Sequence, residues 1–174
     1  MFRASVCAIP DGALLKRHAA DSDGYTECYS ADVDFAVTHA EFVAAFYTTW
    51  LFTLELMILK TIVAKPSTDE QARQLADGVI DTFAAWQVEG RSERELILCD
   101  FCGRTRSWLM RLTTGNGAQA STNLYFGSAV LPEKNEKTGS RTLELSVYLM
   151  LGFHKLYSRA FLYSAKMRLR VLAG

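Results

Sequence analysis

The C-terminal part of the chain carries one long helical pattern behind a series of strand patterns. Residues 143–172 form a continuous helical pattern, and basic residues recur on the side that we expect to face water: Lys155, Arg159, Lys166 and Arg170. A helix of this length needs a partner for its other side, and a sheet with one apolar face needs a cover. The sequence therefore predicts a long helix packed against a sheet.

The strand patterns that precede this helix are separated by short turn signals. We expect strands at residues 83–89, 95–101, 104–113 and 121–131. Cys102-Gly103 and the segment 114–117 are predicted to form tight turns. Strands joined by short turns pair antiparallel, so these segments predict a meander.

The first half of the chain predicts one strand and two helices. Residues 25–33 alternate as a strand does. Thr38 and Glu41 then have the spacing of a capping box in front of an apolar run, so we expect a helix from there to about Ala64, stopped by Pro66. The same spacing occurs between residues 67 and 70, and the second, more polar helix is predicted to end near Gly78.

Together these patterns predict an α+β fold. A curved antiparallel sheet wraps around a long C-terminal helix, and two helices are inserted after the first strand. The chain has 174 residues, which suits one domain. We expect residues 1–24 to be a lead-in segment packed on the domain, and residues 25–174 to form the domain itself.

Charge and hydropathy limit the partners of this fold. Lys+Arg and Asp+Glu are equal at 19 each, which gives no long-range attraction to phosphate backbones, so we expect no nucleic-acid partner. The apolar run 42–64 contains Glu55 and Lys60 and is interrupted too early for a stable membrane span. Residues 4–9 are too few for a signal-peptide core, so we expect a cytoplasmic protein whose cysteines are thiols.

The order of elements resembles the START-like, or helix-grip, superfamily, which includes Bet v 1-like and polyketide-cyclase-like proteins. The resemblance rests on the strand–turn–strand segment 95–110, on the strand 122–130 and on the helix segment 151–157. It is most similar to a bacterial branch of that superfamily. It implies a cavity between sheet and helix for a small hydrophobic or lipid-like molecule, without a cofactor and without any particular chemistry. The sequence shows fewer strands than the superfamily usually has, which leaves the size of the cavity open.

Several residues are candidates for lining such a cavity. Trp108 and Met110 share one strand face with Arg106 at its end, which is how a pocket for an acidic lipid-like ligand would look. The other candidates lie on neighbouring strands or on the final helix: Trp86, Tyr125, Met150, His154 and Tyr157. The alternative is an ordinary sheet core with Arg106 at its rim.

Two further interpretations belong to different classes of function. His154 and Asp100 are acid–base candidates for an enzyme of the cyclase or isomerase type, provided that both face one cavity. The alternative is that His154 is a histidine with its hydrogen bonds satisfied in the core or at an interface. The first half of the last helix is apolar nearly all round, which is also typical of a structural or interaction protein that forms a homodimer through that helix. The equal alternative is that the lead-in segment buries this half of the helix completely.

Cys99 and Cys102 form a CxxC motif, which is half of a common zinc site. A redox CxxC would open a helix, whereas this one falls at a strand end and a turn. We interpret it as two buried thiols in a tight turn, with metal binding and a redox pair as the weaker alternatives, and we expect no bound metal.

Overall fold

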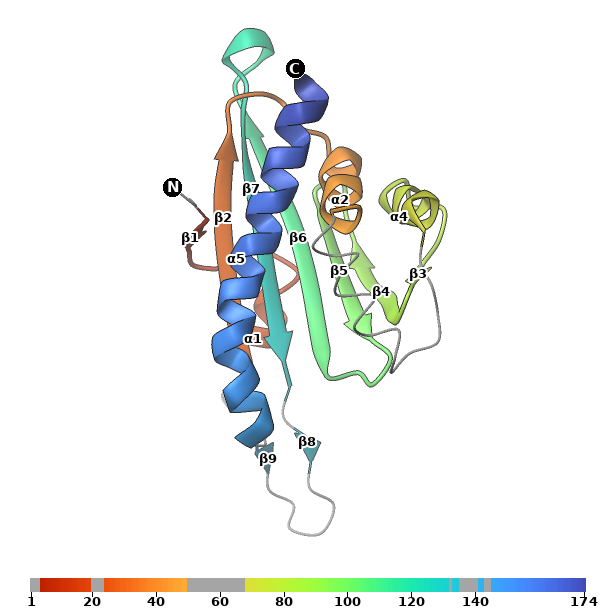
Figure 1. Cartoon of the computed structure of the whole chain (residues 1–174), viewed down its shortest axis with the longest axis vertical. Coiled ribbons are helices and arrows are strands. Elements are labelled where there is room, and N and C mark those ends of the chain that lie inside the picture. The colour runs from red at the N-terminus through yellow and green to blue at the C-terminus, as the bar shows by residue number, and fades with distance from the viewer. Residues whose placement is uncertain (1–3, 20–23, 50–67, 132, 135–140, 143–144) are drawn as a thin grey trace.

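The computed structural model shows a seven-stranded antiparallel sheet with the longer helices packed on one face (Figure 1). The structure describes residues 4–19, 24–49, 68–131, 133–134, 141–142 and 145–174, and it gives the backbone alone for 133–134, 141–142 and 145–156. The strands follow the order β1-β2-β7-β6-β5-β4-β3 across the sheet. Their bounds are β1 Ser5–Val6, β2 Tyr25–Val33, β3 Thr82–Phe83, β4 Trp86–Arg91, β5 Glu95–Asp100, β6 Thr105–Thr114 and β7 Ser121–Val130.

The described helices are α1 (Lys16–Ala19), α2 (His39–Tyr47), α4 (Asp69–Ala76) and α5 (Leu145–Ala173), with a short 3-10 turn, η1, at Gly117–Gln119. β8 (Glu133–Lys134) and β9 (Arg141–Thr142) form a small separate ribbon before α5. Figure 1 shows α5 lying along the sheet, where it contacts β2, β7 and α2. The structure confirms the predicted α+β class. Helices lie between the first long strand and the meander, and a long helix ends the chain.

The first long helix is shorter than the sequence predicts. The capping box is present, because Thr38 Oγ1 accepts a hydrogen bond from the backbone N–H of Glu41 while the Glu41 carboxylate accepts one from the backbone N–H of Thr38. However, α2 ends at Tyr47, and Thr48 follows as its C-cap. The expectation of one helix from there to Ala64 is therefore wrong, and residues 50–67 lie outside the described residues.

The strand count also differs from the prediction. The segment expected as one strand, 83–89, is divided by a turn at Ala84 and Ala85, and Ala84 has a positive φ of 52°. Two alanines carry no turn signal, so the period-2 pattern of the sequence continues across them. The two-residue strands β1 and β3 are too short to produce a pattern, and their pairing with β2 and β4 completes the sheet.

Apolar side chains form two cores, one on each face of the sheet. The larger core lies between the sheet and the helices α2, α4 and α5. Aromatic rings fill its centre, where Phe46 of α2 lies 4.9 Å from Phe126 of β7 and 5.5 Å from Phe161 of α5, measured between ring centroids. The described part of the sheet–helix interface is thus packed with side chains.

The smaller core lies on the other face, beneath the lead-in segment. Its buried members are Ala13, Leu15, Cys28, Ile97, Trp108, Met110 and Ala129. Leu15 is fully buried and packs above Gly127, where a Cβ atom would lie 2.5 Å from Leu15 Cδ2. The lead-in segment therefore closes the second face of the sheet.

Candidate functional site

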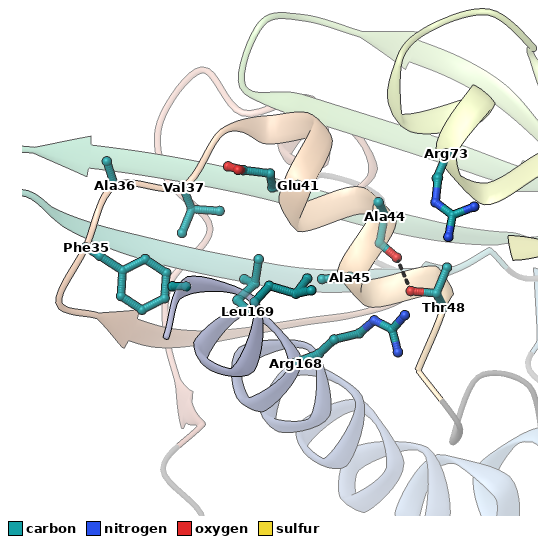
Figure 2. Close-up of a pocket in the computed structure, with 12 residues that line it drawn as sticks. Phe35, Ala36, Val37, Glu41, Ala44, Ala45, Thr48, Arg73, Arg168 and Leu169 are labelled. Atoms are coloured by element: carbon teal, nitrogen blue, oxygen red, sulfur yellow. Dashed lines mark hydrogen bonds between the residues drawn. The ribbon is translucent and has the colours of Figure 1, made fainter. Parts of the chain in front are cut away.

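A pocket lies where α2, α4 and the last turns of α5 meet (Figure 2). Its volume is about 290 Å³. Most of the lining is apolar, and the polar side chains are few. The lining comprises Phe35, Ala36, Val37, Glu41, Ala44, Ala45, Thr48, Arg73, Arg168, Leu169, Leu172 and Ala173.

The connection between β2 and α2 forms one wall of the pocket, and a threonine of the sheet fixes its path. Thr122 Oγ1 accepts a hydrogen bond from the backbone N–H of Val37 at 3.1 Å and donates one to the carbonyl of Phe35 at 2.9 Å. Thr122 is fully buried in β7. The wall is thus anchored to the sheet before α2 begins.

Two guanidinium groups reach the pocket from different helices. Figure 2 shows Arg73 of α4 and Arg168 of α5 on either side of Thr48. Arg73 is exposed and makes an ion pair of 3.4 Å with Glu70 on its own helix. Arg168 is half-buried and has neither an ion pair nor a hydrogen bond with any residue that the structure describes.

The other two polar side chains of the lining are engaged locally. Glu41 Oε2 accepts hydrogen bonds of 2.7 Å from both the backbone N–H and the hydroxyl of Thr38. The Thr48 hydroxyl donates to the carbonyl of Ala44 at 2.7 Å, and its lone pairs can still accept (Figure 2). The arginines are therefore the polar groups best placed for a ligand.

This arrangement is suited to binding an anionic group that carries an apolar part. Guanidinium groups form strong, directional hydrogen bonds to carboxylates and phosphates. The apolar lining at Phe35, Val37 and Leu169 can contact a short hydrocarbon segment. The lining, as far as the structure describes it, contains neither histidine nor cysteine, so the site offers binding groups more than nucleophiles.

Four of the predicted ligand-binding residues lie on the face opposite the helices. Trp108 and Met110 are buried beneath the lead-in segment, and Tyr125 packs against the same core. The prediction that Trp108 and Met110 share a face is confirmed, but the expectation that this face lines a cavity under α5 is wrong. The lead-in segment, which the strand pattern does not reveal, covers that face instead.

Arg106 lies on this same side and is bound by a carboxylate. Its Nε donates to Glu89 Oε2 at 2.9 Å, and Glu89 Oε1 contacts Arg17 Nη2 at 2.7 Å and His18 Nε2 at 2.8 Å. Burial tends to raise the pKa of Glu89, but hydrogen bonds from His18 and Arg106 hold that pKa below its ordinary value. Arg106 thus helps to hold α1 on the sheet and is not directed at the pocket.

The side chains of the remaining ligand-binding candidates either lie on the sheet face that the helices cover or fall outside the described residues. Trp86 and Tyr157 are half-buried against the larger core, and the rings of Tyr157 and Phe161 lie 4.3 Å apart. Met150 and His154 are in α5, but their side chains lie outside the described residues. None of the predicted residues lines the pocket of Figure 2.

The acid–base and metal candidates are separate from this pocket. Asp100 Oδ1 accepts a hydrogen bond of 2.8 Å from the backbone N–H of Arg104, so it stabilises the turn between β5 and β6. The cyclase or isomerase hypothesis, which pairs Asp100 with His154, stays a prediction. The apolar arc proposed for a homodimer also falls on side chains outside the described residues.

Cys99 and Cys102 occupy the strand end and the turn, as predicted. Cys99 is half-buried and Cys102 is exposed. Burial raises the pKa of the Cys99 thiol, with the Arg106 charge acting in the opposite direction. Within the described residues, no group of three or more His, Cys, Asp or Glu side chains could hold a metal ion.

Helical periodicity alone could have indicated one residue of the pocket, which is Arg168. Arg168 follows the buried Phe161 by two helical turns, so both lie on the apolar side of α5, opposite the basic stripe. An arginine on an apolar face is an exception that points to a specific environment. Arg73 and Phe35 carry no comparable signal, because their approach to Arg168 depends on how the helices pack.

Comparison with known proteins does not identify a family. No protein-family model matches the chain, and no curated protein matches it. The observed order of elements agrees with the helix-grip arrangement. The resemblance to the START-like superfamily stays a prediction.

Proposed function

We propose that this protein binds a small anionic amphiphile in the pocket between α2, α4 and the last turns of α5. The anionic group would lie between Arg73 and Arg168, and a short apolar part would lie against Phe35, Val37 and Leu169. The observation that carries this proposal is the convergence of two guanidinium groups on one apolar pocket.

The state of Arg168 argues for an anionic ligand. Among the residues that the structure describes, this half-buried guanidinium has no counter-ion, so part of its hydration is lost without an ion pair in exchange. Hydrogen bonds to a charged group contribute about 1.5–3 kcal/mol each. A ligand carboxylate or phosphate would supply that interaction, whereas a neutral ligand of the same shape would not.

The packing of the sheet–helix interface favours this pocket over the cavity that the sequence suggested. Phe46, Phe126 and Phe161 occupy the centre of the described interface with centroid distances of 4.9 and 5.5 Å. The pocket of about 290 Å³ lies beside this cluster, toward the C-terminal end of α5. Its volume is at the lower end of the range for small-molecule sites.

A structural role for Arg168 makes a different prediction. Arg168 lies in the last turns of α5, where a cation interacts favourably with the negative end of the helix dipole. That interaction contributes to stability and not to ligand affinity. A binding measurement with a matched stability measurement therefore distinguishes the two roles.

The test uses octanoate as a probe for the anionic amphiphile and 1-octanol as its neutral counterpart. Isothermal titration calorimetry should detect octanoate binding and much weaker octanol binding. Arg168→Gln should weaken octanoate binding by about tenfold or more, since a lost charged hydrogen bond of about 1.4 kcal/mol or more corresponds to that factor. Arg73→Gln should weaken it in the same direction.

Arg170→Gln is the matched control. Arg170 lies two residues away on α5, outside the pocket, and its Nη2 is 3.7 Å from Asp34 Oδ1. The control should bind octanoate as the wild type does. Equal octanoate affinities for wild type, Arg168→Gln and Arg73→Gln, or equal affinities of the wild type for octanoate and octanol, would refute the proposal.

A further inference from the structure

Two cysteines that are distant in the sequence meet at the edge of the sheet. Cys7 Sγ lies 3.1 Å from Cys28 Sγ. Cys7 directly follows β1, and its backbone N–H donates to the carbonyl of Cys28 at 3.0 Å, which continues the register of Val6 opposite Tyr29. Backbone pairing between β1 and β2 thus places the two thiols opposite each other.

Cys7 is the more accessible thiol of the pair. Cys7 is half-buried, whereas Cys28 is almost completely buried beneath the lead-in segment. Both line a shallow cavity of about 440 Å³ together with Ile9, Ala19 and Thr26 among others. A small reagent can therefore reach Cys7 first, with Cys28 directly behind it.

The electrostatic environment distinguishes the two sulfur atoms. A hydrogen bond from the Cys28 thiol holds the pKa of Cys7 at about 7, below its ordinary value, although partial burial opposes this effect. The contact with Cys7, together with burial, raises the pKa of Cys28. The lowered pKa favours the thiolate form of Cys7, which is the form that attacks a disulfide.

The CxxC motif lacks these properties. Cys99 Sγ donates to the carbonyl of Asp100 at 3.3 Å, and within the described residues it makes no contact with the exposed Cys102 thiol. The accessible thiol that has a partner is therefore Cys7, which the sequence motif does not indicate.

We propose that Cys7 and Cys28 form a site of reversible oxidation by low-molecular-weight disulfides. The Cys7 thiolate attacks one sulfur of the reagent, and the other sulfur leaves as a thiolate. Cys28 then loses its proton and attacks Cys7 of the mixed disulfide, which releases the second reagent thiol. The two cysteines are oxidised to one disulfide, and the reagent is reduced to two thiols.

The product would connect the lead-in segment covalently to the sheet. β1 pairs with β2 through two residues, Val6 and Ser5, and both of these side chains are exposed. The disulfide would prevent β1 from leaving the sheet edge. Oxidation would thus secure the segment that covers Trp108 and Met110 on the second face.

The experiment uses oxidised glutathione on the full chain in a Cys99→Ser/Cys102→Ser background, in which Cys7 and Cys28 are the remaining cysteines. Intact-mass and peptide analysis should show a Cys7–Cys28 linkage without bound glutathione, reversed by dithiothreitol. Adding Cys28→Ser should trap glutathione on Cys7, because no thiol remains to displace it. Adding Cys7→Ser should leave Cys28 unmodified, because it is buried.

Circular dichroism melting curves of the variants before oxidation show whether each one is folded. Glutathione left on Cys7 when Cys28 is present would overturn the proposal, because the second thiol would then fail to act as the resolving group. Absence of any reaction at Cys7 in the folded Cys28→Ser variant would also overturn it. A Cys7–Cys28 linkage would support the proposal if it forms in the Cys99→Ser/Cys102→Ser protein and if this protein, before oxidation, melts as the wild type does.

Discussion

At the scale of single residues, His39 shows how burial changes a titrating group. It is the first residue of α2, and neither ring nitrogen has a hydrogen-bond partner among the described residues. Burial lowers the pKa of His39 to about 4, and the charges of Arg111 and Arg91 act in the same direction. The backbone of Glu95 acts on this pKa in the opposite direction.

This shift predicts a loss of stability in mild acid. The unfolded chain takes up a proton on His39 near pH 6.5, whereas the folded chain does so only near pH 4, so the unfolded state binds more protons between these values. The contribution of His39 is therefore present above pH 6.5 and is lost as the pH falls toward 4. The loss is on the order of 2–3 kcal/mol.

Urea denaturation at several pH values tests this prediction with the variant His39→Gln, which cannot take up the proton. The wild-type free energy of unfolding should fall more steeply between pH 6.5 and 4 than that of the variant. Parallel pH profiles for the two proteins would show that His39 is not the group responsible.

At the scale of elements, the lead-in segment is held by a close fit between Leu15 and a strand glycine. A Cβ on Gly127 would lie 2.5 Å from Leu15 Cδ2, 2.9 Å from the Glu27 carbonyl oxygen and 3.0 Å from Trp108 Cε3. Glycine is therefore needed for packing at this place in β7, where a larger residue would otherwise suit a strand better.

Substitutions at these two positions should be strongly coupled. Leu15→Ala should cost about 2–5 kcal/mol through a cavity, and Gly127→Ala about 1–3 kcal/mol through overpacking. The double variant should lose less stability than the sum of the two, because removal of the leucine methyl groups makes room for the new Cβ. Chemical denaturation of all four proteins measures the coupling, and strictly additive losses would contradict it.

The elements differ in how far the sequence predicts them. The bounds of β2 and the cap at Thr38 follow from local patterns, because alternation and capping depend on neighbouring residues. β1 and the break at Ala84 depend on pairing with other strands, which no local pattern contains. The face on which Trp108 lies was predicted in part, since alternation groups side chains but does not say what covers them.

At the scale of the whole molecule, one buried carboxylate connects the sheet to the terminal helix. Glu27 Oε1 accepts hydrogen bonds from Ser128 of β7 at 3.1 Å and from Ser158 of α5 at 2.5 Å. Its Oε2 accepts from Tyr25 at 2.9 Å and Tyr29 at 3.0 Å. Burial, together with the Glu27 charge, raises the pKa of Tyr29 to about 12, so this hydroxyl remains a donor.

Removal of this carboxylate should loosen α5 from the sheet. Glu27→Ala should reduce the free energy of unfolding by about 3 kcal/mol or more, because four hydroxyl groups lose their acceptor. Glu27→Gln, which keeps the shape and one acceptor oxygen, should lose less. Urea denaturation gives the stabilities, and hydrogen exchange of α5 amides near Ser158 should show the greater loss of protection in the alanine variant.

Two outcomes would contradict this interpretation. An unchanged stability of Glu27→Ala would mean that the hydroxyl groups find other partners at no cost. Equal losses in the alanine and glutamine variants, with unchanged exchange in α5, would mean that the carboxylate does not connect the helix to the sheet.

The sequence by itself determined the α+β class, the order of the long elements, the start of α2 and the position of the long terminal helix, because these depend on local periodicity and capping. Only the tertiary structure decided that the lead-in segment covers Trp108, that Arg73 and Arg168 meet at one pocket, and that Cys7 contacts Cys28. Such contacts join residues far apart in the chain. Which residues meet is set by strand pairing and helix packing, and a local sequence pattern does not record either one.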